Sequence, residues 1–387
     1  MVDIAQQTAI NPASAKDATP ALVPLSAIEP GQWRALAQRA IEPNGYYLPA
    51  WELAVSATAR DRVGASALPV CGGSSTRLVG LMPVVSLWHA LKIPLPALVS
   101  AHPYGTLCSP LIDRDASVET ATRLLQRARE AGAHALILRD VALDGAAMAS
   151  LKQALGRAGL NPRVLGSYVR ASLDATQDGG GLLHEALGAK KLKELRRQRH
   201  RLAEHGEISF DVARKPDEIE LALETFLQLE ASGWKGKRGT ALIQDAGDAT
   251  FIRRAVPALA ETAQCEIVTL RAGATPVAAG IVLRHQDRAF FFKLGIDESF
   301  AKYSPGVQLT LDLTRHLCAD PAIASADSTA SADHPMINPI WRGRFAVGDV
   351  LIPLRRHDPI VALIHAGLVA RNSARATARR AIHLLRK

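Results

Sequence analysis

The stretch FFFKLGIDESFAKYSPGVQLTLDLTRHL, residues 290–317, determines the expected architecture of the chain. Its apolar beginning predicts a strand, and the apolar periodicity after the Ser-Pro-Gly turn at 304–306 predicts a helix. Serine is a favoured N-cap, proline suits the first helical position, and glycine permits close approach of the backbone. The first amides of this helix, at Gly306, Val307 and Gln308, are therefore predicted to face outward and to bind an anion. The alternative to an anion site is that Ser304 and Pro305 simply begin the helix.

The same order of elements is expected in both halves of the chain. It comprises a strand, a loop or second strand, a helix and a last strand. In the first half these elements are expected at 79–86, 101–113, 117–130 and 134–141. In the second half they are expected at 277–284, 290–306, 307–318 and 323–328. This order predicts an internal structural repeat.

The two copies differ in charge where the helix begins. Asp113, Asp115 and Glu119 surround the helix start in the first copy and would repel a phosphate. The second copy has no carboxylate between Glu298 and Asp312. We therefore expect the anion site in the second copy.

The glycine-rich segment TQDGGG, residues 176–181, predicts a junction between domains. After it we expect a long helix from Leu182 to His205 and, further on, a loop GWKGKRGTAL at 233–242. The expected organisation is a flexible N-terminus at 1–20, a first lobe at 21–181, a second lobe at 182–355 and a basic amphipathic helix at 356–387.

The composition describes a globular protein with room for two cores. The chain has 387 residues, of which 48% are hydrophobic and 5% aromatic, and this excludes a largely disordered chain. The net charge is +9, but residues 190–201 carry +6 and residues 355–387 carry +7, so the remainder carries −4. A basic stripe along a groove is not visible, which argues against nucleic acid as a partner.

Cysteine spacing and hydropathy bear on metal content and compartment. The four cysteines lie far apart and in no metal-binding pattern, so no metal is expected. The N-terminus has no basic start followed by an apolar segment, and prolines and charges interrupt the most apolar stretch, 79–101. We expect a cytoplasmic protein whose basic C-terminal helix either packs on the body or makes weak peripheral contact with the inner membrane face.

Four blocks of sequence resemble a known family of acyltransferases. They are HPYGTLCSPLID at 102–113, LEASGWKGKRGTAL at 229–242, KYSPGVQL at 302–309 and DSTASADHPMINPIWRGR at 327–344. In this order, over roughly residues 30–355, they resemble the GNAT-type acyltransferases of the BioF2-like or cellulose-biosynthesis CelD-like group, which are related to the FemAB proteins. The resemblance implies an α/β (α+β) fold of tandem GNAT-like lobes, each a mixed, mostly antiparallel sheet flanked by helices, with the C-terminal basic helix added.

The resemblance also implies acyl-CoA, acetyl-CoA or a longer homologue, bound in the second lobe, and an amine acceptor between the lobes. The strand before the turn would supply an oxyanion N–H, and the turn would hold the pyrophosphate. The residues expected at the cofactor are Lys293, Leu294, Gly295, Ser304, Gly306, Val307 and Gln308.

Acyl transfer to an amine needs a base, a stabilised oxyanion and a proton for the leaving thiolate. Asp327, Glu230 and His334 are the candidates for the base. Asp327 is equally compatible with a turn or cap, and Glu230, at a helix end, with an ion pair to Lys235. Tyr303 either returns the proton to the thiolate or covers the adenine of the cofactor.

Four further residues are candidates for binding the acceptor. Trp234 and Lys235, between glycines, would form a clamp, although a tryptophan under a loop is as compatible with a core position. Asn338 and Trp341 belong to the last of the four blocks, and a buried polar network explains them as well as substrate binding does.

The sequence thus predicts an N-acyltransferase acting on an amine of a sugar, an amino acid or an envelope or exopolysaccharide precursor. The first alternative is aminoacyl transfer from charged tRNA, as in FemAB proteins, which the basic helix at 190–201 favours. The second is a non-catalytic accessory protein of exopolysaccharide synthesis that keeps the fold.

Overall fold

The computed structural model describes residues 20–60, 64–72, 76–101 and 104–385. The side chains of residues 234–235 and 375–385 are not described. The flexible segment expected at 1–20 lies outside the described residues, apart from its last residue.

The strands form one continuous sheet in the order β1-β2-β3-β4-β6-β13-β7-β12-β11-β10-β9-β8, with β5 paired to β3. Most neighbouring strands are antiparallel, but β4 and β6 are parallel, as are β11 and β12. The strands are β1 (Val23–Pro24), β2 (Ser66–Cys71), β3 (Leu78–Ser86), β4 (Ala97–Ser100), β5 (Leu111–Ile112), β6 (Ala135–Ala142), β7 (Arg163–Asp174), β8 (Ile208–Ala213), β9 (Cys265–Ala272), β10 (Thr275–His285), β11 (Arg288–Ile296), β12 (Ser325–Asp327) and β13 (Gly343–Pro353).

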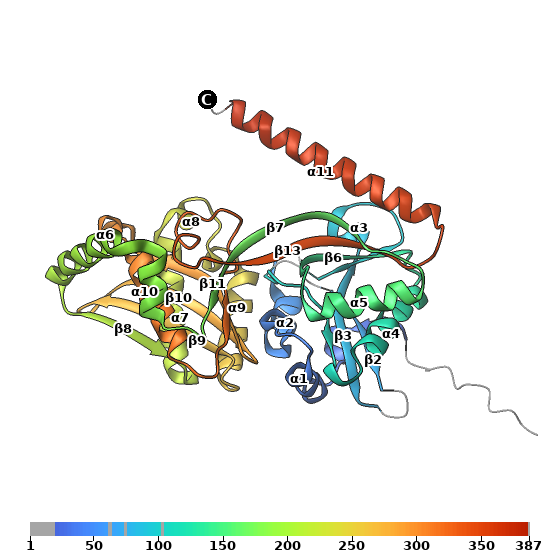
Figure 1. The fold of residues 1–387 in the computed structure, drawn as a ribbon, viewed down its shortest axis with the longest axis horizontal. Helices are drawn as coiled ribbons and strands as arrows, with labels where there is room; N and C mark the ends of the chain where they lie inside the picture. Colours follow the sequence, from blue (N-terminus) through green and yellow to red (C-terminus); the bar gives the residue numbers. More distant parts are fainter. Residues whose placement is uncertain (1–19, 61–63, 73–75, 102–103, 386–387) are drawn as a thin grey trace, which may run out of the picture.

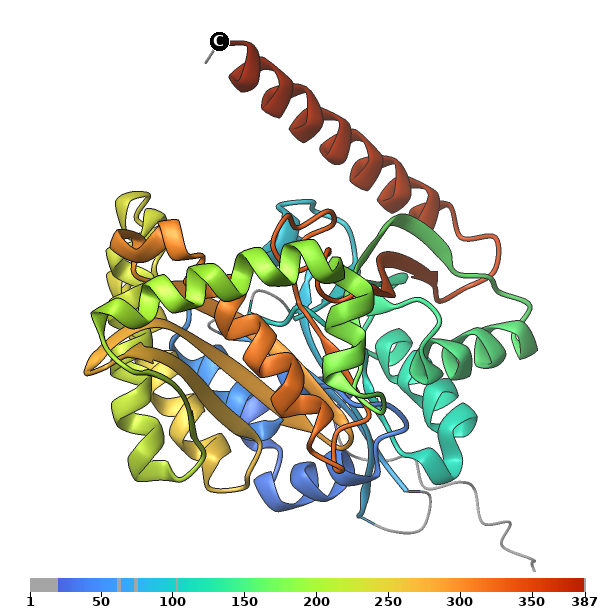
Figure 2. The ribbon, with the colours of Figure 1, turned by 60° about the vertical axis from the view of Figure 1, so that its left-hand side comes forward.

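Helices cover both faces of this sheet. Several of the segments between helices and strands are short 3-10 turns. In the second half, α6 and α10 pack together on one face (Figure 2), while α7 and α9 share the other core. The helices are α1 (Pro30–Arg39), α2 (Pro49–Thr58), α3 (Leu87–Leu91), α4 (Ser117–Glu130), α5 (Ala146–Arg157), α6 (Gly179–Leu202), α7 (Pro216–Ser232), α8 (Trp234–Lys237), α9 (Ala246–Ala260), α10 (Pro305–Cys318) and α11 (Pro359–Leu385).

The internal repeat is confirmed in the topology of the sheet. In the first half, antiparallel β3 and β4 are followed by α4 and then by β6, which is parallel to β4. In the second half, antiparallel β10 and β11 are followed by α10 and then by β12, which is parallel to β11. The expected fold class of tandem lobes, each with a mixed sheet and flanking helices, is therefore confirmed.

Strand β13 connects the two lobes more closely than the sequence indicates. It comes from the expected second lobe but lies between β6 and β7 of the first. Figure 1 shows β7 and β13 running side by side from one half to the other. The lobes therefore share a sheet, and no simple cut in the sequence at 181 separates them.

A shared aromatic core also joins the lobes. The ring of Trp51 on α2 packs edge-on against Phe251 at 4.9 Å and against Phe292 at 4.8 Å between centroids. Tyr46 packs in the same way against Phe290 at 5.6 Å. Edge-to-face pairs of buried aromatic rings stabilise a contact beyond the area they bury, by about 0.5–1.5 kcal/mol per pair. This core fixes the position of β11 relative to the first lobe.

Two expectations about local structure are wrong. The long helix expected from Leu182 is interrupted at Gly188, whose φ of 71° and ψ of 163° are not helical. Only glycine adopts such a conformation without strain, so the glycine itself permits the break. The second is the loop expected at 233–242, which instead contains a short helix, α8, and a 3-10 turn, Leu242–Gln244.

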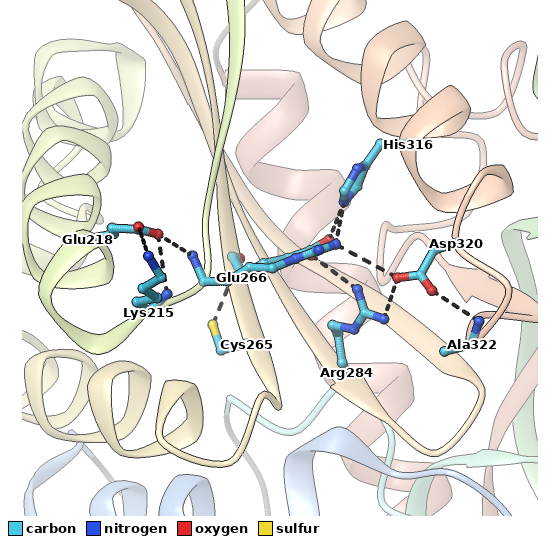
Figure 3. A network of polar contacts seen from close by, with 9 residues as sticks. Lys215, Glu218, Cys265, Glu266, Arg284, His316, Asp320 and Ala322 are labelled. Carbon is cyan, nitrogen blue, oxygen red and sulfur yellow. Dashed lines mark hydrogen bonds and ion pairs between the residues drawn. The ribbon is translucent and has the colours of Figure 1, made fainter.

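A buried charge network holds the C-terminal end of α10 (Figure 3). The carboxylate of Glu266 on β9 is fully buried and lies 3.1 Å from Arg284 and 3.1 Å from His316 on α10. Arg284 also contacts Asp320 at 2.6 Å. Burial would raise the pKa of Glu266, but His316, Arg284 and Arg214 hold it below its ordinary value. The network therefore fixes the orientation of α10 from the end opposite its first residues.

Helix α11 packs on the body through its first turns. Val361, Ile364 and Leu368 are buried against β4, β6 and β13, and beyond them the helix projects away from the body (Figure 1). Within the described residues, we find no helix with the length and hydropathy that a membrane span requires.

Candidate functional site

The two parallel strands that flank α10 separate at their carboxyl ends. β11 and β12 pair at three positions, from Arg288 with Ser325 to Phe290 with Asp327. β12 ends there, whereas β11 continues to Ile296. Within the described part of the chain, the backbone of β11 beyond Phe290 therefore has no neighbouring strand on the β12 side.

A cavity of about 470 Å³ occupies the space between the separated strands and the start of α10. Its size is typical of a site for a small molecule or for part of a cofactor. No carboxylate lines it among the described residues, and its one charged side chain there is that of Lys293. The lining consists of Phe291, Phe292, Lys293, Leu294, Ile296, Ala301, Ser304, Pro305, Gly306, Val307, Ser328, Thr329, Ala330, His334, Met336 and Ile337.

A β-bulge lies on β11 beside this cavity. Ile281 on β10 pairs with Lys293 and Val282 pairs with Phe291, so Phe292 is the extra residue. A bulge bends a strand and changes the direction of the side chains that follow it. Its position brings Lys293 to the cavity and within reach of α7.

Lys293 forms an ion pair with Glu230 near the end of α7. Its Nζ lies 3.1 Å from Oε1 of Glu230, which is buried, and the amide of Leu242 donates to Oε2 at 3.0 Å. An added Cβ on Gly295 would lie 2.8 Å from the amide nitrogen of Glu230, so this glycine is needed for the close approach of β11 to α7. Glu230 therefore pairs with Lys293, whereas the side chain of Lys235, its expected partner, lies outside the described residues.

The first turn of α10 agrees in part with the sequence prediction. Pro305 occupies the first helical position as expected. The expected side-chain cap from Ser304 is absent, because its backbone is left-handed with φ 54° and makes no side-chain bond to the helix. Gly306 and Val307 line the cavity, and an added Cβ on Gly306 would lie 3.0 Å from Leu294. The glycine therefore permits close packing of α10 on β11.

Gln308 is not part of this cavity. Its amide donates to the carbonyl of Ser304 at 3.0 Å, and its buried side chain donates to the carbonyl of Leu195 on α6 at 2.8 Å. The amides of Gly306 and Val307 are then the ones at the cavity that precede the regular hydrogen bonds of the helix.

Asp327, the first candidate for the base, is buried in an ion pair. It contacts the fully buried guanidinium of Arg170 on β7 and accepts a hydrogen bond from the amide of Thr329 at 2.9 Å. Burial would lower the pKa of Arg170, but the charge of Asp327 outweighs it and the pKa is raised. Asp327 does not line the cavity. The following turn does, because the hydroxyl of Thr329 donates to the carbonyl of Phe291 at 2.7 Å.

Of the other two catalytic candidates, His334 lines the cavity and Tyr303 does not. The amide of Met336 donates to Nδ1 of His334 at 3.3 Å, and burial lowers the pKa of this imidazole. Its proton then lies on Nε2, which makes it a hydrogen-bond donor. The hydroxyl of Tyr303 lies 2.9 Å from Nε2 of His205, within the core that α6 and α10 share.

The expected acceptor-binding residues do not come together in the described part of the structure. Trp341 is fully buried and its Nε1 donates to the hydroxyl of Thr314 at 2.8 Å, which supports the alternative of a buried polar network. Asn338 does not line the cavity. The side chains of Trp234 and Lys235 lie outside the described residues.

In the first lobe, the segment before α4 carries a buried carboxylate that is paired with two arginines. Asp113, just before α4, is buried and lies 3.0 Å from Arg39 and 2.8 Å from Arg77. Burial opposes its ionisation, but hydrogen bonds from Arg77 and Arg39 hold its pKa below the ordinary value. An ionised, arginine-paired carboxylate thus lies at the turn before α4 in the first lobe, whereas no carboxylate lines the cavity in the described part of the second.

Residues 189–334 match the family model of the acetyltransferase (GNAT) domain. The match covers most of the second lobe, including β11, α10 and the cavity lining except Met336 and Ile337, and it begins directly after the break at Gly188. The chain therefore contains a GNAT-type acyltransferase fold. The sequence matches no curated protein.

Solved structures with the same fold extend over most of the chain. FemX has a TM-score of 0.58 at 12% identity, covering 87% of this chain and 98% of its own. The C-terminal domain of a putative lysylphosphatidylglycerol synthetase from Agrobacterium fabrum has a TM-score of 0.53 at 13% identity, covering 88% and 95%. A conserved protein of unknown function from Bacteroides thetaiotaomicron has a TM-score of 0.50 at 13% identity, covering 85% and 98%. At these identities the likeness concerns the fold alone.

Proposed function

We propose that the chain is an N-acyltransferase that takes its acyl group from acyl-CoA, most simply acetyl-CoA, bound in the cavity between β11 and β12. The observation that carries the proposal is the combination of separated parallel strands, a largely apolar cavity and the first amides of α10 at its wall. The amides of Gly306 and Val307 would hold a pyrophosphate at the positive end of the helix dipole. The apolar lining would receive the uncharged arm that leads to the thioester.

Lys293 is the residue that we assign to the reacting carbonyl. Attack of the amine on the thioester produces a tetrahedral oxyanion, and preorganised donors lower the free energy of that intermediate. Lys293 carries a positive charge at the cavity wall, and its ion pair with Glu230 limits its conformations. The backbone of β11 beside it would donate a second hydrogen bond. His334 would donate from Nε2 to the departing sulfur.

The acceptor that we propose is an amine of a sugar, an amino acid or an envelope or exopolysaccharide precursor, as in the BioF2-like and CelD-like group that the sequence blocks resemble. The base remains a prediction among Asp327, Glu230 and His334, and in the tautomer with Nδ1 bonded to Met336 the imidazole has no free acceptor. Both carboxylate candidates already form ion pairs, Asp327 with Arg170 and Glu230 with Lys293. Removal of a proton from the acceptor by either would require that its pair open.

Aminoacyl transfer from charged tRNA is the second candidate function. One face of α6 forms a concave basic surface lined by Lys190, Lys193, Glu194, Arg196, Arg197 and His200. Such a surface suits a polyanionic donor better than a single cofactor. The name of the Agrobacterium neighbour, a putative lysylphosphatidylglycerol synthetase, is also that of an enzyme that transfers an aminoacyl group.

Thermal shift of the full chain with acetyl-CoA, free CoA and charged tRNA tests the proposal. Ligand binding to the folded state alone raises the melting temperature, so acetyl-CoA and CoA should both raise it. In Gly306→Val this shift should be lost, because even the first added carbon would lie 3.0 Å from Leu294. Gly156→Val on α5, where an added Cβ meets nothing within 4 Å, is the matched control. A shift with tRNA alone that declines steeply with salt would replace the CoA proposal by the tRNA one.

A further inference from the structure

A second cavity, of about 580 Å³, lies between the two halves of the molecule. The first half contributes the segment before the Gly45–Tyr47 turn and the start of α5, and the second contributes the β10–β11 turn and the beginning of β13. Arg288, the first residue of β11, lines this cavity, whereas Lys293 lines the first. Five residues of strand correspond to roughly 16 Å, so the two cavities are separate sites.

Glu42 lines this second cavity and has an unsatisfied acceptor. The residue is 8% exposed, and its Oε2 accepts a hydrogen bond from the amide of Ala147 at the start of α5, at 3.0 Å. Oε1 is buried and has no hydrogen-bond partner within the described residues. Capping of α5 explains one oxygen but leaves the other without a donor, which is unfavourable for a buried carboxylate. A donor from a ligand, above all an ammonium group, would satisfy it.

Besides Arg114, which donates to the backbone carbonyls of residues 38–40, two arginines give the same cavity its positive charge. Arg288 uses Nε to donate to the hydroxyl of Ser325 at 3.1 Å, and its guanidinium lies over the ring of Phe345 at 5.2 Å. Arg344 donates through NH1 to backbone carbonyls. In the described part of the chain neither guanidinium pairs with a carboxylate, so both retain donors for an anion.

We propose that this cavity binds a small zwitterion, an amino acid or a dipeptide, with its ammonium group on Glu42 and its carboxylate on Arg288. The exposed carboxylates of Asp144 and Asp287 at the same cavity disfavour a polyanion such as a nucleotide. Because the ligand contacts residues of both lobes, its binding links their positions. The site is independent of the donor that the first cavity takes.

Isothermal titration calorimetry of the full chain tests the proposal with L-alanine and L-alanyl-L-alanine as probes. N-acetyl-L-alanine, which lacks the ammonium group, and L-alaninamide, which lacks the carboxylate, are the matched ligands. Both zwitterions should bind, and each single-charge analogue should bind about ten- to hundred-fold more weakly, as expected for loss of one charge-assisted hydrogen bond. Equal binding of all four probes, or no binding at 10 mM, would overturn the proposal.

Glu42→Gln separates this site from the acyl-donor cavity. The amide oxygen of glutamine still accepts from Ala147, so α5 keeps its cap, while the negative charge is lost. The variant should lose binding of the zwitterions and keep the thermal shift with acetyl-CoA. Glu204→Gln, at an exposed residue after α6, should change neither. Unchanged zwitterion binding in Glu42→Gln would place the ligand elsewhere and contradict the assignment.

Discussion

His285 at the end of β10 should make the stability of the fold sensitive to pH between about 6.5 and about 4. It is buried, its Nδ1 accepts from the amide of Asn44 at 2.8 Å, and its Nε2 lies 3.0 Å from the carbonyl of Ala37. These contacts join the second lobe to the first and require a neutral imidazole. Burial lowers the pKa from 6.5 to about 4, although the Ala37 carbonyl and Asp287 act in the opposite direction.

The sign and size of the effect follow from proton linkage. Below pH 6.5 the unfolded chain binds a proton at this histidine, whereas the folded chain does so only near pH 4. The stability contribution is therefore complete above pH 6.5 and is lost as the pH falls to about 4. The pKa of His285 is lowered by about 2.5 units, from 6.5 to about 4. At 1.36 kcal/mol per pKa unit, this shift corresponds to about 3 kcal/mol of unfolding free energy.

Urea unfolding at pH 8, 6.5, 5.5 and 4.5 of the wild type and of His285→Gln measures this contribution. At pH 8 the variant should be less stable by about 1–3 kcal/mol, because it loses a buried hydrogen-bond partner. The difference should shrink toward pH 4.5, since the variant has no imidazole to protonate. His89→Gln, at an exposed position, should leave the pH dependence unchanged. Parallel curves for the wild type and His285→Gln would refute the reasoning.

Three further outcomes are expected. Lys293→Met should lower kcat by about 10²–10³-fold with little change in acetyl-CoA affinity, as expected for loss of an oxyanion donor. Steady-state kinetics measures kcat and calorimetry measures the affinity. Equal losses in kcat and affinity would contradict the role of Lys293. Arg170→Met and Asp327→Asn should each destabilise the fold by about 3–5 kcal/mol in chemical denaturation, because each change leaves a buried charge unpaired. The double variant leaves no unpaired charge, so its destabilisation should be less than the sum of the two. For the proposed membrane contact of α11, truncation after Asn372 should abolish salt-sensitive co-sedimentation with anionic vesicles and leave the melting temperature nearly unchanged, since Val361, Ile364 and Leu368, which pack on the body, precede it. Absence of vesicle binding in the full chain, or binding that survives truncation, would contradict the contact.

Elements with strong local signals were predicted well. The apolar periodicity at 117–130 predicted a helix that matches α4 residue for residue, and the Ser-Pro-Gly turn predicted the start of α10 at Pro305. The position of β13 between β6 and β7 has no local signal, because pairing of distant strands depends on the whole sheet. The break at Gly188 was missed because single glycines are also tolerated within helices.

The same distinction explains what was missed at the candidate site. Gly306, Val307 and Lys293 are close in sequence and were predicted together, and they line one cavity. Arg170 was not predicted, because it reaches Asp327 only through the pairing of β7 with β12. An arginine within a strand pattern, where a buried charge requires a partner, was the one available signal.

The contrast between the lobes argues for a division of roles that the repeat alone does not impose. Both lobes contain the unit of strand, helix and parallel strand that presents helix amides at the carboxyl ends of the strands. In the first lobe Asp113 and its arginine partners lie at the 3-10 turn that leads into α4, so an anion there would meet a carboxylate. In the second lobe the bulge at Phe292 and the short β12 leave a cavity, and the charge nearest to it is Lys293. The two copies of the repeat thus differ in charge before the helix, and this difference supports the proposal that the acyl donor binds in the second lobe.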